Sequence, residues 1–189
     1  MARDNKFGAP REESKDFLLR LLVGALGGVS ATGPMTIGMV WLHRQLPSRH
    51  RYSLPPREIT IQGMKILGLH KKLGPEARAA VTLLNHFGYG AMAAVIYSLA
   101  EWRVPAGASI KGPIFGAIVW LVSYFGLLPA LGVLDPATKH PSSRNALMFI
   151  VHLVWGLFVG LFVDTLLSEK KSVFGAILTG SPLPQRDRK

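Results

Sequence analysis

Length, composition and charge narrow the class of protein. The chain has 189 residues, of which 49% are apolar and only 17% are charged, and its formal net charge is +11. Its mean hydropathy is still positive, at +0.27, so the apolar residues must be gathered into blocks. The chain has no cysteine, which excludes disulfides, iron–sulfur clusters and thiolate zinc sites.

The sequence contains four long apolar blocks, at 21–41, 79–100, 114–134 and 146–167. Each is close to the roughly 20 residues that a helix needs to cross a hydrocarbon core. The first three blocks contain no Lys, Arg, Asp or Glu, and the fourth contains only Asp164. The blocks predict an all-α polytopic membrane protein, a bundle of four transmembrane helices made of two hairpins.

The other segments are arranged around a membrane domain that we expect at 17–168. A polar N-terminal tail, 1–16, precedes this domain, and a basic C-terminal tail, 169–189, follows it. The first apolar block is too long for the core of a cleavable signal peptide, so we expect it to remain as an anchor. Lys and Arg are shared almost equally between the two sides of the predicted spans, so they do not decide the orientation.

The longest connection between predicted spans is the basic loop 44–78. It carries eight Lys or Arg residues and only two acids, Glu58 and Glu76. Basic residues beside membrane spans are typical of segments that meet anionic lipid headgroups. No nucleic-acid-binding signature accompanies them, so we predict membrane lipids as the partner and not nucleic acid.

Small residues recur at intervals of four within three of the blocks and across the start of the third block. Residues at this spacing share one ridge of a helix, and small residues there let helix backbones approach closely in lipid. The predicted helix-packing residues are Gly24, Gly28, Gly90, Gly112, Gly116, Gly156 and Gly160. The second block (His86, Gly90, Ala94, Ser98) and the fourth (His152, Gly156, Gly160, Asp164) share one pattern, which is also compatible with a duplication.

Two histidines begin these matching ridges at similar depths below one membrane face. A pair of neutral imidazoles on facing helices is what bis-histidine haem ligation requires, so His86 and His152 are candidate ligands of a haem b. The alternative is a structural or interface role, with each ring bonded to a backbone carbonyl or to Thr82, Asn85 or Ser123. We expect no cofactor, with haem as the alternative.

Three polar residues in the spans suggest a possible path for an ion or small solute. Thr32 and Thr36 flank the Gly33-Pro34 pair in the first block, and Asp164 is an intramembrane acid. A kinked packing site at the threonines and a hydrated helix end at Asp164 are the alternatives. A small transporter or channel is therefore a second functional alternative.

The chain resembles small bacterial inner-membrane proteins of the YagU-like type. The likeness rests on GALGGVSATGPMT from Gly24 to Thr36, on Leu54-Pro55-Pro56-Arg57, on the HFGYG segment from His86 to Gly90, and on Asn145 to Gly156. It implies a multi-pass protein of the bacterial inner membrane. It brings no catalytic role to any of these residues.

The sequence favours packing over chemistry as the function. It has many helix-packing seams and no Walker loop, GxSxG elbow or HExxH motif. We therefore expect a non-enzymatic accessory or assembly subunit, which forms a homo-oligomer or joins a larger membrane complex.

Overall fold

The computed structural model describes the backbone of residues 10–179 and the side chains of residues 16–169. All regular structure in this range is helical, which confirms the predicted all-α class. The helices are α1 (Pro10–Gln45), α2 (Pro55–Ile66), α3 (Pro75–Ala100), α4 (Ala108–Leu121), α5 (Leu128–Ala130) and α6 (Ser142–Thr179). A π-helical segment, η3 (Val122–Leu127), joins α4 to α5 without a break, and short 3-10 turns lie at Ser48–His50, Glu101–Arg103 and Ala137–Lys139.

Four helical segments in this range are long and apolar enough to cross a membrane. They are Asp16–Gln45, Pro75–Arg103, Ala108–Ala130 and Ser142–Glu169. The third begins six residues earlier than its apolar block because Lys111 and Pro113 lie inside the helix. It ends before Leu134, since Gly132 adopts a φ of +65°, the left-handed conformation that commonly terminates a helix.

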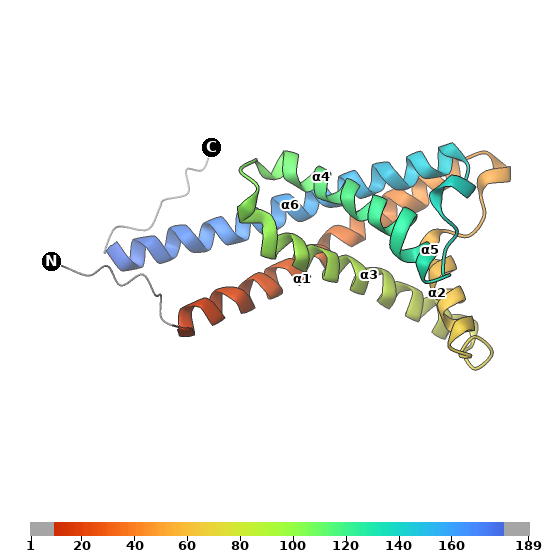
Figure 1. The fold of residues 1–189 in the computed structure, drawn as a ribbon, viewed down its shortest axis with the longest axis horizontal. Coiled ribbons are helices and arrows are strands. Elements are labelled where there is room, and N and C mark those ends of the chain that lie inside the picture. Colours follow the sequence, from red (N-terminus) through yellow and green to blue (C-terminus); the bar gives the residue numbers. More distant parts are fainter. Residues whose placement is uncertain (1–9, 180–189) are drawn as a thin grey trace.

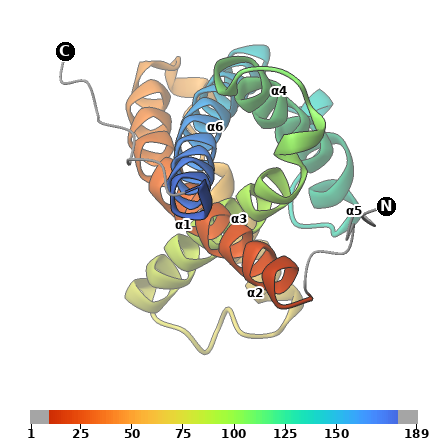
Figure 2. The same cartoon turned by 90° about the vertical axis from the view of Figure 1, so that its left-hand side faces the viewer.

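The four long helices pack in the spatial order α3, α1, α6, α4. Helix α1 lies against both α3 and α6, and α4 lies against α6, while α3 and α6 make only slight contact. Figure 1 shows the helices lying lengthwise beside one another. Figure 2, which looks along them, shows α6 between α1 and α4. Helices adjacent in sequence thus form two pairs, and the α1–α6 contact joins the pairs.

Glycines allow the backbones of each pair to approach closely. A Cβ added to Gly24 would lie 2.7 Å from the Val95 Cα, and one added to Gly112 would lie 2.5 Å from the Gly156 carbonyl oxygen. The same applies to the other predicted packing glycines, which face backbone or side-chain atoms of the partner helix: Gly28, Gly90, Gly116, Gly156 and Gly160. Helices in contact through such seams gain dispersion energy that bulkier residues would prevent.

Helix α6, which lies between α1 and α4, has apolar residues on every side. Val159 and Val163 on this helix are fully buried, whereas Ile150 and Phe158 are 49% and 44% exposed. A helix that is apolar on every side is typical of a protein interior or a membrane span. Large apolar side chains are also exposed on α1, α3 and α4, such as Ile37 at 73%.

Buried Arg144 holds the loop after α1 against the start of α6. Its guanidinium is only 2% exposed and donates hydrogen bonds to the backbone oxygens of Tyr52, at 3.0 Å, and Ser53. It also stacks over the Tyr52 ring, 3.7 Å from the centroid. The Tyr52 hydroxyl donates to His140 Nδ1 at 2.6 Å, because His140 Nε2–H donates to the Asp135 carbonyl. Burial raises the pKa of the Tyr52 phenol above its usual range.

Candidate functional site

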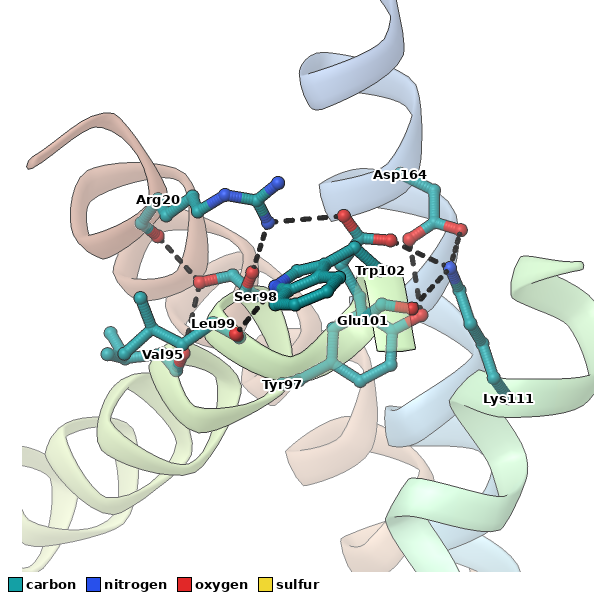
Figure 3. Close-up of polar contacts among 9 residues, drawn as sticks. All are labelled: Arg20, Val95, Tyr97, Ser98, Leu99, Glu101, Trp102, Lys111 and Asp164. Atoms are coloured by element: carbon teal, nitrogen blue, oxygen red, sulfur yellow. Dashed lines mark hydrogen bonds and ion pairs between the residues drawn. The ribbon is translucent and has the colours of Figure 1, made fainter. Parts of the chain in front are cut away.

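Four charged side chains, one from each long helical segment, meet at one end of the structure (Figure 3). Lys111 Nζ lies 2.9 Å from Glu101 Oε2 and 2.8 Å from Asp164 Oδ2. Arg20 Nη1 lies 3.1 Å from Glu101 Oε1. Lys111 and Glu101 are only 9% and 10% exposed. We call these four residues the charged cluster; its two cations and two anions sum to zero, which lowers the cost of placing them away from water.

Neighbouring groups fix the geometry of the charged cluster. The Tyr97 hydroxyl donates to Asp164 Oδ1 at 3.2 Å, and Arg20 Nη1 also donates to the Ser98 carbonyl at 2.6 Å. Ser98 returns a hydrogen bond of 2.6 Å to the Arg20 carbonyl. Arg20 and Ser98 therefore join α1 to α3 reciprocally at one end of their contact, and each carboxylate has partners from more than one helix.

A small cavity of about 60 Å³ lies nearer the opposite end of the helices and has both candidate histidines on its wall. Its lining comes from α1, α2, α3, α4, η3 and α6. The lining residues are Thr32, Met35, Met39, Pro55, Pro56, His86, Tyr89, Gly90, Val119, Tyr124, Met148, His152 and Trp155. The packing order thus places the two histidines on one cavity although their helices hardly touch.

The two histidines differ in their hydrogen bonding. His152 Nδ1 lies 2.6 Å from the Met148 carbonyl oxygen, which can only accept, so Nδ1 carries the proton and donates. His86 Nε2 is buried and has no hydrogen-bond partner among the described residues. The side chains considered as partners are engaged elsewhere: Asn85 donates to Thr60, Thr82 to the Arg78 carbonyl, and Ser123 to the Val119 carbonyl.

The size of the cavity limits what it can hold. A volume of about 60 Å³ accommodates a few water molecules. A porphyrin is much larger, so haem ligation by His86 and His152 would require the helices to separate. Within the described residues, no group of three or more His, Asp or Glu side chains is arranged to hold a metal ion.

The three residues of the predicted polar path lie in different surroundings. Thr32 lines the cavity, donates to the Gly28 carbonyl at 2.7 Å and accepts from Trp155 Nε1 at 3.2 Å. Thr36 donates to the Thr32 carbonyl at 2.6 Å. Asp164 belongs to the charged cluster. The structure therefore brings the two threonines together and leaves Asp164 in a separate site.

Sequence reasoning missed Lys111 and Arg144 as site residues. Lys111 was placed outside the third span, although it precedes the small-residue ridge that begins at Gly112, and this position was a usable signal. Arg144 binds backbone carbonyls from a distant loop, for which side-chain patterns give no signal. Tyr89 was also missed as a link between helices; its hydroxyl donates to Ser123 Oγ at 2.6 Å.

A family model described as "Protein of unknown function (DUF1440)" matches residues 41–161, from the last residues of α1 into α6. The chain belongs to the DUF1440 family. The region that matches the DUF1440 model contains both cavity histidines together with Glu101 and Lys111, whereas Arg20 and Asp164 lie outside it. No curated protein and no solved structure matches the chain.

Proposed function

We propose that this DUF1440 member is a non-enzymatic multi-pass membrane protein that serves as an accessory or assembly subunit of a larger membrane complex. The observation that carries the proposal is the exposure of large apolar side chains on all four long helices. Examples are Ile37 on α1, Leu84 on α3, Ile114 on α4 and Ile150 on α6, which are 49% to 73% exposed. Such faces need lipid or partner helices to cover them.

The internal polar groups support a structural role over a chemical one. The four charges of the charged cluster neutralise one another, and the threonine hydroxyls bond to their own helix. Catalysis requires a nucleophile, base or metal directed toward a space for substrate. In the described residues the cavity wall carries two histidines, three thioethers and the hydroxyls of Thr32, Tyr89 and Tyr124, with no carboxylate.

The proposal includes the cellular setting that the sequence motifs suggest. In it the four helices span the bacterial inner membrane as a bundle, and the protein is of the YagU-like type. The basic loop 44–78 meets anionic headgroups, and a homo-oligomer is the alternative to a mixed complex. Alkaline carbonate extraction tests insertion first: an integral protein stays in the membrane pellet, and release into the supernatant would overturn the proposal.

Purification from native membranes in mild detergent tests the subunit role. We expect the chain to elute well above its own mass of 20.6 kDa plus micelle, with reproducible partners or further copies identified by mass spectrometry. The Leu84→Ala variant changes an exposed face of α3 and should weaken the assembly if that face contacts a partner. The Gly156→Leu variant disrupts the α4–α6 contact inside the chain and tests whether the assembly depends on that packing. A monomer with no partner at native expression would contradict the proposal.

An absorption spectrum of the same sample tests the haem alternative. A Soret band that disappears in a His152→Ala variant would make the histidine pair a haem site. Solute flux in liposomes that depends on Asp164 would favour the transport alternative. We expect neither signal.

A further inference from the structure

A second, open hollow of about 510 Å³ lies beside the small cavity, at the end of the molecule where α1 ends and α3 begins. Met39, Pro56 and His86 line both spaces. The hollow extends from the basic loop along the ends of two membrane-length helices. It therefore lies where the proposed membrane span would meet the headgroup layer.

The charged lining of this hollow consists of cations only. Arg51 and Arg57 line it, and neither guanidinium has a hydrogen bond or ion pair with another described side chain or backbone group. His43 also lines it and donates from Nε2 to the Tyr52 carbonyl at 3.0 Å. No Asp or Glu lies on its wall. A guanidinium has the positive charge and the forked donors that suit a phosphate group, and this hollow has two of them.

Besides its cations, His86 and the hydroxyl side chains of Thr36, Tyr52, Ser53 and Thr82, the hollow has an apolar floor. Val40 of α1 is 36% exposed and Leu83 of α3 is 54% exposed, and both line the hollow. Met39 and Leu54 add further apolar surface. A soluble phosphate compound would leave this floor uncovered, whereas an acyl chain would cover it.

We propose that this hollow binds a single glycerophospholipid with an anionic headgroup. Its phosphate lies between Arg51 and Arg57, and the start of an acyl chain lies along Val40 and Leu83. The inference rests on the proposed membrane insertion but names a partner that insertion alone does not require. Basic hollows between membrane helices are a known setting for specific binding of anionic lipids.

Native mass spectrometry of the full chain in a neutral detergent tests the site. The protein is titrated with phosphatidylglycerol, with phosphatidylcholine as the neutral comparison. Because a neutral micelle has no surface potential, the first bound lipid reports the site and not general attraction to a charged bilayer. We expect phosphatidylglycerol to bind at least about tenfold more tightly than phosphatidylcholine at one lipid per chain.

Matched charge variants locate the site. The double variant Arg51→Gln, Arg57→Gln should remove the preference for phosphatidylglycerol. Lys71→Gln, Lys72→Gln removes the same charge from exposed residues of the same loop that do not line the hollow, and it should keep the preference. A third variant, Val40→Trp, fills the apolar floor and should weaken lipid binding while both arginines remain.

Three results would overturn the proposal. One is equal loss in the two double variants, which would indicate general surface charge. Another is displacement of the lipid by glycerol phosphate at comparable concentration, which would indicate a soluble anion as the ligand. The third is unchanged binding in both the arginine variant and Val40→Trp. Carbonate extraction of each variant separates these failures from a failure to insert into the membrane.

Discussion

Lys111 and Asp164 form an ion pair of 2.8 Å between α4 and α6, and the same ammonium lies 2.9 Å from Glu101. One buried cation thus serves two carboxylates from different helices. Removing it would leave Glu101 paired only with Arg20, and Asp164 bonded only to the Tyr97 hydroxyl. The charged cluster is therefore the place where a single substitution has the widest effect on helix packing.

We predict that Lys111→Met lowers stability by roughly 3 kcal/mol, the lower end of the range for breaking a buried ion pair, because Asp164 keeps partial access to solvent. Thermal unfolding in detergent, followed by circular dichroism, measures the change in Tm. The control is Lys139→Met, which breaks an ion pair whose side chains are 66% and 59% exposed, and no measurable change is expected there. Equal shifts in the two variants would refute a special role for the charged cluster.

The α4–α6 contact gives a second prediction. A Cβ at Gly116 would collide with the backbone of His152, which cannot move without separating the helices. Gly116→Ala should therefore lower stability by about 1–3 kcal/mol, as overpacking does. Gly88→Ala is the control, since an added Cβ there meets no atom within 4 Å. Gly88→Ala should leave the stability unchanged or raise it slightly. Denaturant-dependent unfolding of the two variants separates the effect of the helix contact from the effect of losing a glycine.

Because Arg144 holds the loop after α1 by hydrogen bonds, we predict that replacing it changes the protease sensitivity of that loop. Lysine keeps the charge but loses the planar, forked donor that reaches the Tyr52 and Ser53 carbonyls. Arg144→Lys should speed tryptic cleavage at Arg49 and Arg51 by about tenfold or more, corresponding to at least about 1.4 kcal/mol of lost local stability. Arg103→Lys, at an arginine stacked on exposed Trp102, is the matched control. Cleavage at the wild-type rate in Arg144→Lys would show that the loop is held by other contacts.

Tyr52 gives a prediction about alkaline pH. Burial raises its pKa, so the folded protein holds the phenolic proton more tightly than the unfolded chain does. The resulting contribution to stability is complete below the unfolded pKa, near 10, and is lost as the pH rises through the higher folded value. The difference in tyrosinate absorbance between the wild type and Tyr52→Phe should therefore titrate above pH 10. A midpoint at or below the value of a free tyrosine would contradict the raised pKa.

Much of the helical architecture could be predicted from the sequence because lipid imposes simple rules. A helix needs about 20 apolar residues to cross a bilayer, and such blocks are visible without any knowledge of tertiary contacts. Glycines such as Gly28 and Gly112 at intervals of four mark close contacts for the same reason. The residue at which the third span begins was less predictable. Lys111 was assigned to a connection because a lone charge beside an apolar block usually marks its end.

The composition of the sites depends on which helices become neighbours, and residue patterns alone do not reveal that packing order. The spacing of His86 and His152 placed them at similar depths, but the shared cavity depends on α1 lying between α3 and α6. The partners of Arg144 are backbone carbonyls in an irregular loop, so no residue pattern identifies them. The same holds for the open hollow, whose two arginines face one space only after the loop folds back.

The one-per-helix composition of the charged cluster has a consequence for how the chain is synthesised. As the segments emerge in order, they deliver Arg20, then Glu101, then Lys111, and finally Asp164. A nascent chain that has not yet placed α6 therefore holds one surplus positive charge among these groups. The last helix balances it, so its arrival turns three loosely matched segments into an electrically neutral unit.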